Sequence, residues 1–193
     1  RGLPWPLGGH GIMQAGDQGL LRFGQYSTHG QRFDCWFTTD KTRHCIIARR
    51  MDGEPLPTGG GGAKAKFLQG SNPSWPIGIL EARAFPVILM VEGGPDGLAA
   101  CAAIMEEARW SDAAVAVMAS SSPAIHPDAL PHFNGKRVRI FADDGHAGAQ
   151  ASQKWERQLH QAGADVDILS LAHVRGCKDL EELMRLPLTH RLI

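Results

Sequence analysis

The chain has 193 residues, and its 20 Lys and Arg residues balance 20 Asp and Glu residues, which excludes a polybasic protein that binds nucleic acid through bulk charge. Hydrophobic residues make up 43% of the sequence, as is typical of a globular chain with one large or two small domains. The four cysteines form no CxxC pair, and no apolar stretch approaches the roughly 20 residues that span a bilayer, so we expect a cytoplasmic protein without disulfides, structural zinc or membrane contact.

Glycine is concentrated at the start of the chain, where 15 of the 23 glycines precede residue 79. Short β-like runs at 32–38 and 44–49 are separated there by Gly, Asp and Asn turn residues. The run Gly59–Gly62 has the composition of a flexible loop tip. These features predict a small, strand-rich lobe over residues 1–80.

Strands and helices alternate from residue 81 onward. Trp155 lies on an apolar helical stripe and is predicted to be a core residue. The alternation predicts an α/β domain over residues 81–193, with a parallel sheet covered by helices on both faces. Its predicted strands are 85–91, 113–118, 137–142 and 166–171, and its predicted helices are 95–110 and 147–162.

Acidic residues follow three of these predicted strands. Glu92 follows the first strand, Asp143 and Asp144 follow the third, and Asp179 lies just beyond the fourth. Ligands of parallel sheets bind beyond the carboxyl ends of the strands, and Mg²⁺ or Mn²⁺ takes carboxylate oxygens. The pattern therefore predicts a metal site for phosphoryl transfer, with the glycines of 93–97 allowing a phosphate or a backbone segment to approach. Taken singly, each acid is explained as well by helix capping.

The order of these segments resembles that of the Toprim domain, the metal-binding catalytic module of primases, topoisomerases and related nucleases. Glu92-Gly93-Gly94-Pro95-Asp96 resembles its E-G-x-x-D signature, residues 143–148 resemble D-x-D-x-x-G, and residues 177–183 are similar to the K-D-x-x-E/D-L segment of primases. The similarity runs from about residue 86 to residue 186. It implies a Toprim-like α/β fold and a metal site whose ligands are Glu92, Asp143, Asp144, Asp96 and Asp179.

The first part of the chain is similar to the basic lobe that precedes Toprim in bacterial and phage primases. The similar segments are residues 49–53, Lys64, Lys66 and residues 70–71, and Arg1-Gly2-Leu3 resembles the usual beginning of that lobe. Without the resemblance, a group of six basic residues between positions 41 and 66 more often belongs to a solvated surface.

The resemblance also implies which side chains meet nucleic acid. Lys64 and Lys66 would face the template or the incoming nucleotide, with Arg49 and Arg50 nearby, and Lys178 would steady phosphates. Lys and Arg perform this role by neutralising phosphate charge.

Two tryptophans of the first part are candidates for base stacking. Of Trp36 and Trp75, Trp75 is the better candidate because it lies in a predicted loop, where an aromatic ring is less often needed to pack the core.

These resemblances imply the catalytic core of a DNA primase, a DNA-replication enzyme that makes short RNA primers by metal-dependent nucleotidyl transfer. Its implied partners are single-stranded DNA template and NTPs, with a replicative helicase as a further partner and Mg²⁺ or Mn²⁺ as cofactor. Glu92 would act as metal ligand or general base, while Asp143 and Asp144 would hold the metal on the triphosphate. Residues 59–65 lack the Gly-Lys-Ser/Thr end of a P-loop, so the chain encodes no helicase motor.

One position departs from the Toprim pattern. Gly145 stands where the second Asp of D-x-D is expected, which removes one implied ligand and predicts weakened catalysis. A non-catalytic nucleic-acid-binding module is therefore an alternative, and a Toprim nuclease, which uses much the same acids, is another. A topoisomerase is disfavoured because the one tyrosine, Tyr26, lies in the predicted basic lobe.

Overall fold

The computed structural model of this chain describes residues 3–119, 124–143, 145–171 and 176–191. Its parallel sheet consists of β7 (Val87–Glu92), β8 (Ala113–Met118), β9 (Arg137–Ala142) and β10 (Asp165–Ser170), in the order β10-β9-β7-β8. All three strand pairings of this sheet are parallel. Every residue of β8 is buried, as a strand covered on both faces requires.

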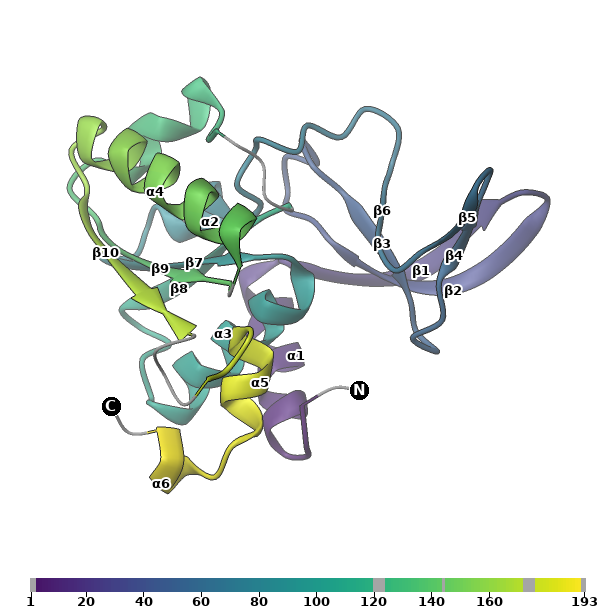
Figure 1. Cartoon of the computed structure of the whole chain (residues 1–193), viewed down its shortest axis with the longest axis horizontal. Coiled ribbons are helices and arrows are strands. Elements are labelled where there is room, and N and C mark those ends of the chain that lie inside the picture. Colours follow the sequence, from purple (N-terminus) through teal and green to yellow (C-terminus); the bar gives the residue numbers. More distant parts are fainter. Residues whose placement is uncertain (1–2, 120–123, 144, 172–175, 192–193) are drawn as a thin grey trace.

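Helices cover both faces of this sheet (Figure 1). Helix α4 lies on one face, and α3 and α5 lie on the other. Trp155 of α4 is 1% exposed, which confirms its predicted place in the core. The α/β architecture is therefore confirmed. The helical elements of the domain are α2 (Ile79–Ala82), α3 (Gly94–Glu106), the 3₁₀ helix η1 (Pro127–Phe133), α4 (His146–Gln161), α5 (Leu180–Arg185) and α6 (Leu188–Arg191).

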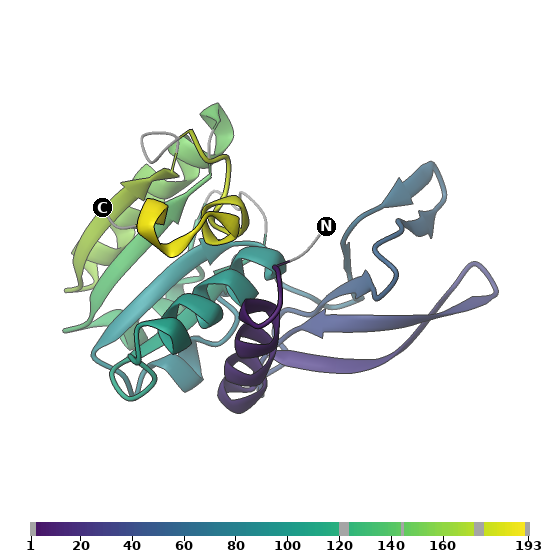
Figure 2. The same cartoon turned by 90° about the horizontal axis from the view of Figure 1, so that it is seen from below.

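The strand-rich lobe is an antiparallel sheet with a separate hairpin. The sheet has the order β1-β2-β3-β6, and the lobe projects away from the parallel sheet (Figures 1 and 2). A small core, built on the buried residues Cys35, Ala48 and Leu56, joins the hairpin to one face of the sheet. The strands of the lobe are β1 (Leu21–Thr28), β2 (Gln31–Thr38), β3 (Ile47–Arg50), β4 (Leu56–Thr58), β5 (Gly61–Ala63) and β6 (Lys66–Phe67), of which β4 and β5 form the hairpin.

Helix α1 (Leu7–Gln18) precedes the lobe in sequence but packs against α3 of the α/β domain (Figure 2). A Cβ at Gly11 would lie 2.4 Å from the carbonyl oxygen of Leu98, so only glycine permits this close approach of the two helices. Composition alone did not predict this helix, whose residues were assigned to the strand-rich lobe.

The edge of the parallel sheet at β8 is covered by segments from outside the sheet. The side-chain amide of Gln18 donates to the carbonyl of Val115 at 2.6 Å and accepts from its N–H at 3.0 Å. Ile77 forms a reciprocal pair of backbone hydrogen bonds with Val117, each 2.9 Å long. These contacts satisfy backbone groups that an edge strand would otherwise expose.

Within the part of the chain that the structure describes, no helix combines the length and the apolar character needed to cross a membrane.

Candidate active site at the carboxyl edge of the parallel sheet

Neighbouring strands bring Glu92 and Asp143 to one edge of the sheet. Glu92 is the last residue of β7, Asp143 directly follows β9, and these two strands pair in parallel. The pKa of the Asp143 carboxyl is raised to about 7, mainly by burial and also by the negative charges of Glu92 and Asp179, with Lys178 opposing the increase. Four of the predicted site residues therefore share one electrostatic environment.

Asp96 lies in the first turn of α3, behind this edge. The side chain is 8% exposed and accepts a hydrogen bond of 3.0 Å from the backbone N–H of Glu181 in α5. The pKa of Asp96 is raised to about 8, mainly by burial and also by the charges of Asp143, Asp179 and Glu181, while the hydrogen bond from the Glu181 N–H lowers it. This carboxyl thus links α3 to α5 within the same negative field.

Asp179 is the N-cap residue of α5. Its carboxylate accepts from the backbone N–H of Glu182 at 2.8 Å, and Glu182 in turn accepts from the backbone N–H of Lys178 at 2.9 Å. The capping interpretation therefore holds for Asp179, which also lies near enough to Asp143 to raise its pKa. The cap fixes the start of α5 against the acidic edge.

The glycines near the acids permit close packing. A Cβ at Gly94 would lie 2.3 Å from the Thr38 hydroxyl and 3.0 Å from the Trp36 ring, so Gly94 lets β2 pack on the start of α3. A Cβ at Gly148 would lie 2.8 Å from the carbonyl oxygen of Asp143, so Gly148 lets the segment after β9 lie against α4. At both positions glycine admits a neighbouring part of the protein, the second of the two roles expected for these residues.

Gly145, the position where the Toprim pattern has its second Asp, is the N-cap of α4. Its backbone has φ 127° and ψ 159°, a conformation that side-chain-bearing residues rarely adopt. A Cβ there would meet no atom within 4 Å, so an Asp would be strained by the backbone conformation rather than by crowding. Asp144, also predicted as a ligand, lies outside the described residues.

No three His, Cys, Asp or Glu side chains among the described residues stand close enough together to hold one metal ion as they are. The donor set at the edge is nevertheless made only of carboxylates, the oxygen ligands that Mg²⁺ and Mn²⁺ prefer. Besides burial, the charges of Glu92 and Asp179 raise the pKa of Asp143, and a cation between the carboxylates would relieve that repulsion. The carboxylate donors present therefore suit a divalent cation.

Arg49 of β3 extends from the strand-rich lobe to this acidic field. Burial lowers the pKa of its guanidinium, while the charges of Asp96 and Glu181 oppose that change. Its Nε is buried and has no hydrogen-bond partner, and its Cζ lies 5.9 Å from the centre of the Trp36 ring. The structure therefore places Arg49 close to Asp96, one of the predicted metal ligands.

Arg50, the next residue, belongs to the opposite face of the sheet. Its guanidinium forms an ion pair with Asp52, donates to the carbonyl of Pro55 at 3.3 Å and lies 4.7 Å from the Phe33 ring centre. Alternate residues of a strand point to opposite faces, which separates the two arginines. In this structure the guanidinium of Arg50 is engaged within the lobe.

The two lysines of the lobe differ in environment. Lys66 donates to the Thr28 hydroxyl at 3.0 Å, and its Nζ lies 5.5 Å from the Tyr26 ring centre. Lys64, just after β5, is exposed, as is Lys178 at the start of the α5 segment. Their contacts with phosphate stay predictions.

The interpretation of Trp75 as a base-stacking residue requires correction. Trp75 is 5% exposed, its indole N–H donates to Asp40 at 3.2 Å, and its ring lies 4.4 Å from that of His44 and 5.7 Å from that of His126. Asp40 also accepts from the backbone N–H of Gly78 at 2.9 Å. Trp75 is therefore part of the packed connection between the lobe and the α/β domain, and its ring faces are covered.

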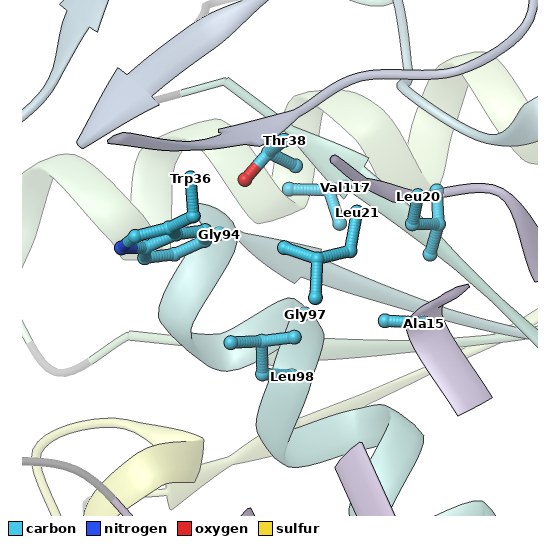
Figure 3. Close-up of a pocket in the computed structure, with 9 residues that line it drawn as sticks. All are labelled: Ala15, Leu20, Leu21, Trp36, Thr38, Gly94, Gly97, Leu98 and Val117. Carbon is cyan, nitrogen blue, oxygen red and sulfur yellow. The ribbon is translucent and has the colours of Figure 1, made fainter. Parts of the chain in front are cut away.

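A small, mostly apolar pocket marks that connection on the other side of β2 (Figure 3). Trp36 and Thr38 from β2 lie over Gly94 and Leu98 of α3 in this view. The sequence analysis ranked Trp36 below Trp75 as a base-stacking candidate and did not place it beside the acids. The pairing of β2 with β3 places Trp36 and Arg49 on one face, and the sequence alone carries no signal for that register.

Together, the acidic edge and the preceding lobe define a protein with a primase-like fold and a Toprim-like α/β domain. Among solved structures the chain is similar to the crystal structure of the primase fragment of the bacteriophage T7 primase-helicase protein, with a TM-score of 0.52 and 14% sequence identity. The match covers 89% of this chain and 63% of that chain, so this chain spans less than two thirds of that fragment. At this identity the likeness establishes the fold alone. No family model matches the sequence, and no curated protein matches it either.

Proposed function

We propose that the chain is the catalytic core of a DNA primase, which uses NTPs and a single-stranded DNA template to make short RNA primers. The observation that carries this proposal is the acidic edge at Glu92 and Asp143, where burial and the charge of Glu92 raise the pKa of Asp143, together with Arg49 of the strand-rich lobe beside it. A carboxylate cluster next to a guanidinium suits the joint binding of a divalent cation and a phosphate chain. The primase-like fold agrees with this chemistry.

Glu92 and Asp143 would hold Mg²⁺ or Mn²⁺, with Asp179 and Asp144 as further candidate ligands. When bound, such a cation neutralises phosphate oxygens and stabilises the charge that develops during nucleotidyl transfer. Asp96, which is buried and bonded to the Glu181 N–H, would contribute mainly by holding α3 against α5 beneath the ligands.

The remaining roles fall to the chain's own side chains. Glu92, at the tip of β7, would act either as a ligand of the cation or as the acceptor of the proton of the attacking 3′-hydroxyl. Lys178, which is exposed and already lowers the pKa of Asp143, would contact the triphosphate. Lys64 and Lys66 would contact the template backbone from the lobe, because ammonium groups neutralise phosphates without reading sequence. A replicative helicase would be a further partner of such a core.

A non-catalytic nucleic-acid-binding module is the second candidate function. The backbone of Gly145 favours it, because φ 127° disfavours the second Asp that a complete D-x-D motif needs. A nuclease would use the same acids, but the lobe that carries Arg49, Lys64 and Lys66 favours synthesis on a template over cleavage.

Primer synthesis on single-stranded templates of mixed sequence, with labelled NTPs and Mg²⁺ or Mn²⁺, tests the proposal. Wild type should extend primers, and Asp143→Asn and Glu92→Gln should each lose at least about tenfold in rate, because a ligand carboxylate or the proton acceptor is gone. Asp17→Asn, which removes an exposed carboxylate of α1, is the charge-matched control and should match wild type. Cleavage of an end-labelled template that depends on the same two residues would indicate the nuclease instead. Binding of single strands with no synthesis under any condition would indicate the non-catalytic module.

A further inference from the structure

A row of side chains crosses three strands of the lobe on the face that meets the acidic edge. Phe23 of β1 pairs with Trp36 of β2, and Trp36 pairs with Arg49 of β3. Directly paired residues of antiparallel strands share one face of the sheet, so two aromatic rings and a guanidinium stand side by side. Arg49 is the end of this row nearest the acids, because it interacts with the charges of Asp96 and Glu181.

The packing of the row leaves its outer end open. Trp36 is half-buried because its ring contacts the start of α3 at Gly94, whereas Phe23 is 56% exposed. The neighbouring pair outward on the same face is polar, since the Gln25 amide donates to Asp34 at 3.2 Å. Polar groups therefore bound the exposed ring of Phe23 on its outer side. On the inner side the same face continues with Leu21, Thr38, Ile47 and Phe67, of which Phe67 is 37% exposed.

We propose that Phe23 and Trp36 form a stacking platform for a base of single-stranded nucleic acid that leads to the acidic edge. This inference rests on the proposed function, to which it adds a binding subsite. Aromatic rings stack on any base, because every base has a π-face, and the adjoining phosphate would find the positive charge of Arg49 at the inner end of the row.

The dimensions of the row favour a base over a protein partner. A stable protein interface buries roughly 1,000 Å² or more around an apolar centre, whereas the exposed part of this row is the ring of Phe23, between the polar pair Gln25 and Asp34 and the packed connection to α3. A single base needs only one ring face. The guanidinium beside the indole also complements a phosphate, which a nucleic acid supplies and an apolar protein surface does not.

Fluorescence anisotropy with labelled oligothymidine, and with an abasic strand of equal length, tests this proposal without requiring primer synthesis. Phe23→Ala should weaken oligothymidine binding roughly 5-fold or more, and the slope of log K against log salt should stay unchanged because no charge is removed. Phe23→Tyr keeps the ring and should bind like wild type. The abasic strand should bind wild type and Phe23→Ala equally, because it has no bases to stack.

Trp110→Ala is the matched control. Trp110 is 53% exposed and precedes β8, at the sheet edge opposite the acids, so its loss should leave binding unchanged. Equal affinity of Phe23→Ala and wild type for oligothymidine would overturn the proposal, as would an equal loss for the abasic strand. A change in oligomeric state by light scattering, with unchanged oligothymidine affinity, would also overturn it and assign the row to self-association. If primer synthesis fails but the expected binding pattern is seen, the proposed function is refuted and the stacking platform is supported. If wild type does not bind single strands, the stacking platform is refuted.

Discussion

Replacing Asp96 by Asn removes a buried ionisable carboxyl without changing the shape of the side chain. The amide oxygen of Asn can still accept the hydrogen bond from the Glu181 N–H that Asp96 accepts at 3.0 Å. What disappears is an ionisable group whose pKa is raised to about 8 by burial and by the charges of Asp143, Asp179 and Glu181. Arg49 is the positive group that faces it. We therefore expect Asp96→Asn to stabilise the metal-free protein at neutral pH.

The direction and size of the effect follow from proton binding. Because the pKa of Asp96 in the folded state, about 8, exceeds the ordinary value of 3.8, the folded state binds more protons than the unfolded state between these values. The free energy of unfolding of wild type therefore falls as pH rises through this range. A pH of 7 lies about three units above the ordinary pKa of Asp. At 1.36 kcal/mol per unit, the stability advantage of Asp96→Asn at this pH is at most about 4 kcal/mol. The advantage of the Asn variant should shrink by up to about 1.4 kcal/mol for each pH unit below 7.

Thermal unfolding followed by circular dichroism, in EDTA at pH 5, 6, 7 and 8, measures this advantage. For a chain of this length each kcal/mol corresponds to about 2–4 °C in Tm. Asp17→Asn, an exposed carboxylate substitution on α1, is the control and should show no such pH-dependent gain. A stability difference between Asp96→Asn and wild type that is constant from pH 5 to pH 8, or a less stable variant at pH 7, would refute the reasoning.

Three further substitutions test other parts of the molecule. Gly145→Asp should cost about 1 kcal/mol or more, because φ is 127° there, and should lower primer synthesis; thermal unfolding and the primer assay measure both. Replacing Lys64 and Lys66 together by Ala should weaken single-strand binding and flatten its log–log salt slope by about 1 to 2, as measured by anisotropy between 50 and 200 mM salt. Gly148→Ala should weaken Mg²⁺ binding, measured by calorimetry, because a Cβ would lie 2.8 Å from the carbonyl oxygen of Asp143 and displace that residue.

Each of these predictions has a contrary outcome. Tighter Mg²⁺ binding and faster synthesis by Gly145→Asp would mean that the loop readily accepts the second carboxylate. An unchanged salt slope would mean that the two lysines do not meet phosphate. Gly16→Ala is the control for Gly148→Ala, because a Cβ at Gly16 meets nothing within 4 Å and alanine favours a helix. If Gly148→Ala binds Mg²⁺ as tightly as wild type, Asp143 is not a ligand of the cation.

The parallel sheet could be predicted from sequence because its strands are short apolar runs separated by amphipathic helices. The parallel arrangement of β7 and β9 then brings Glu92 and Asp143 to one edge, so the grouping of these acids follows from strand order alone. The α1 helix could not be predicted in this way. Its four glycines lower helix propensity, and it is stabilised by packing on α3, where Gly11 permits contact with Leu98.

Long-range contacts determine the positions of the residues that the sequence analysis placed wrongly or could not tell apart. Trp75 lies in a loop-like segment, yet it is buried because Asp40, 35 residues earlier, accepts its indole N–H. Arg49 and Arg50 are indistinguishable by composition, and only the register of β3 against β2 shows that Arg49 shares a face with Trp36. Register is set by tertiary packing, which a single sequence does not display.

The covered edges of the parallel sheet limit how copies of this chain can associate. At β8 the side chain of Gln18 takes the place that a residue of a further strand would occupy, and Ile77 occupies the adjacent position. At the opposite edge, β10 carries Asp165, which is exposed, and Asp167, which forms an ion pair with Arg139 of the neighbouring strand. Charged groups on an edge strand disfavour the addition of a foreign strand. Growth of this sheet into an intermolecular one is therefore opposed on both sides, which favours clean refolding at the high concentrations that structural work requires.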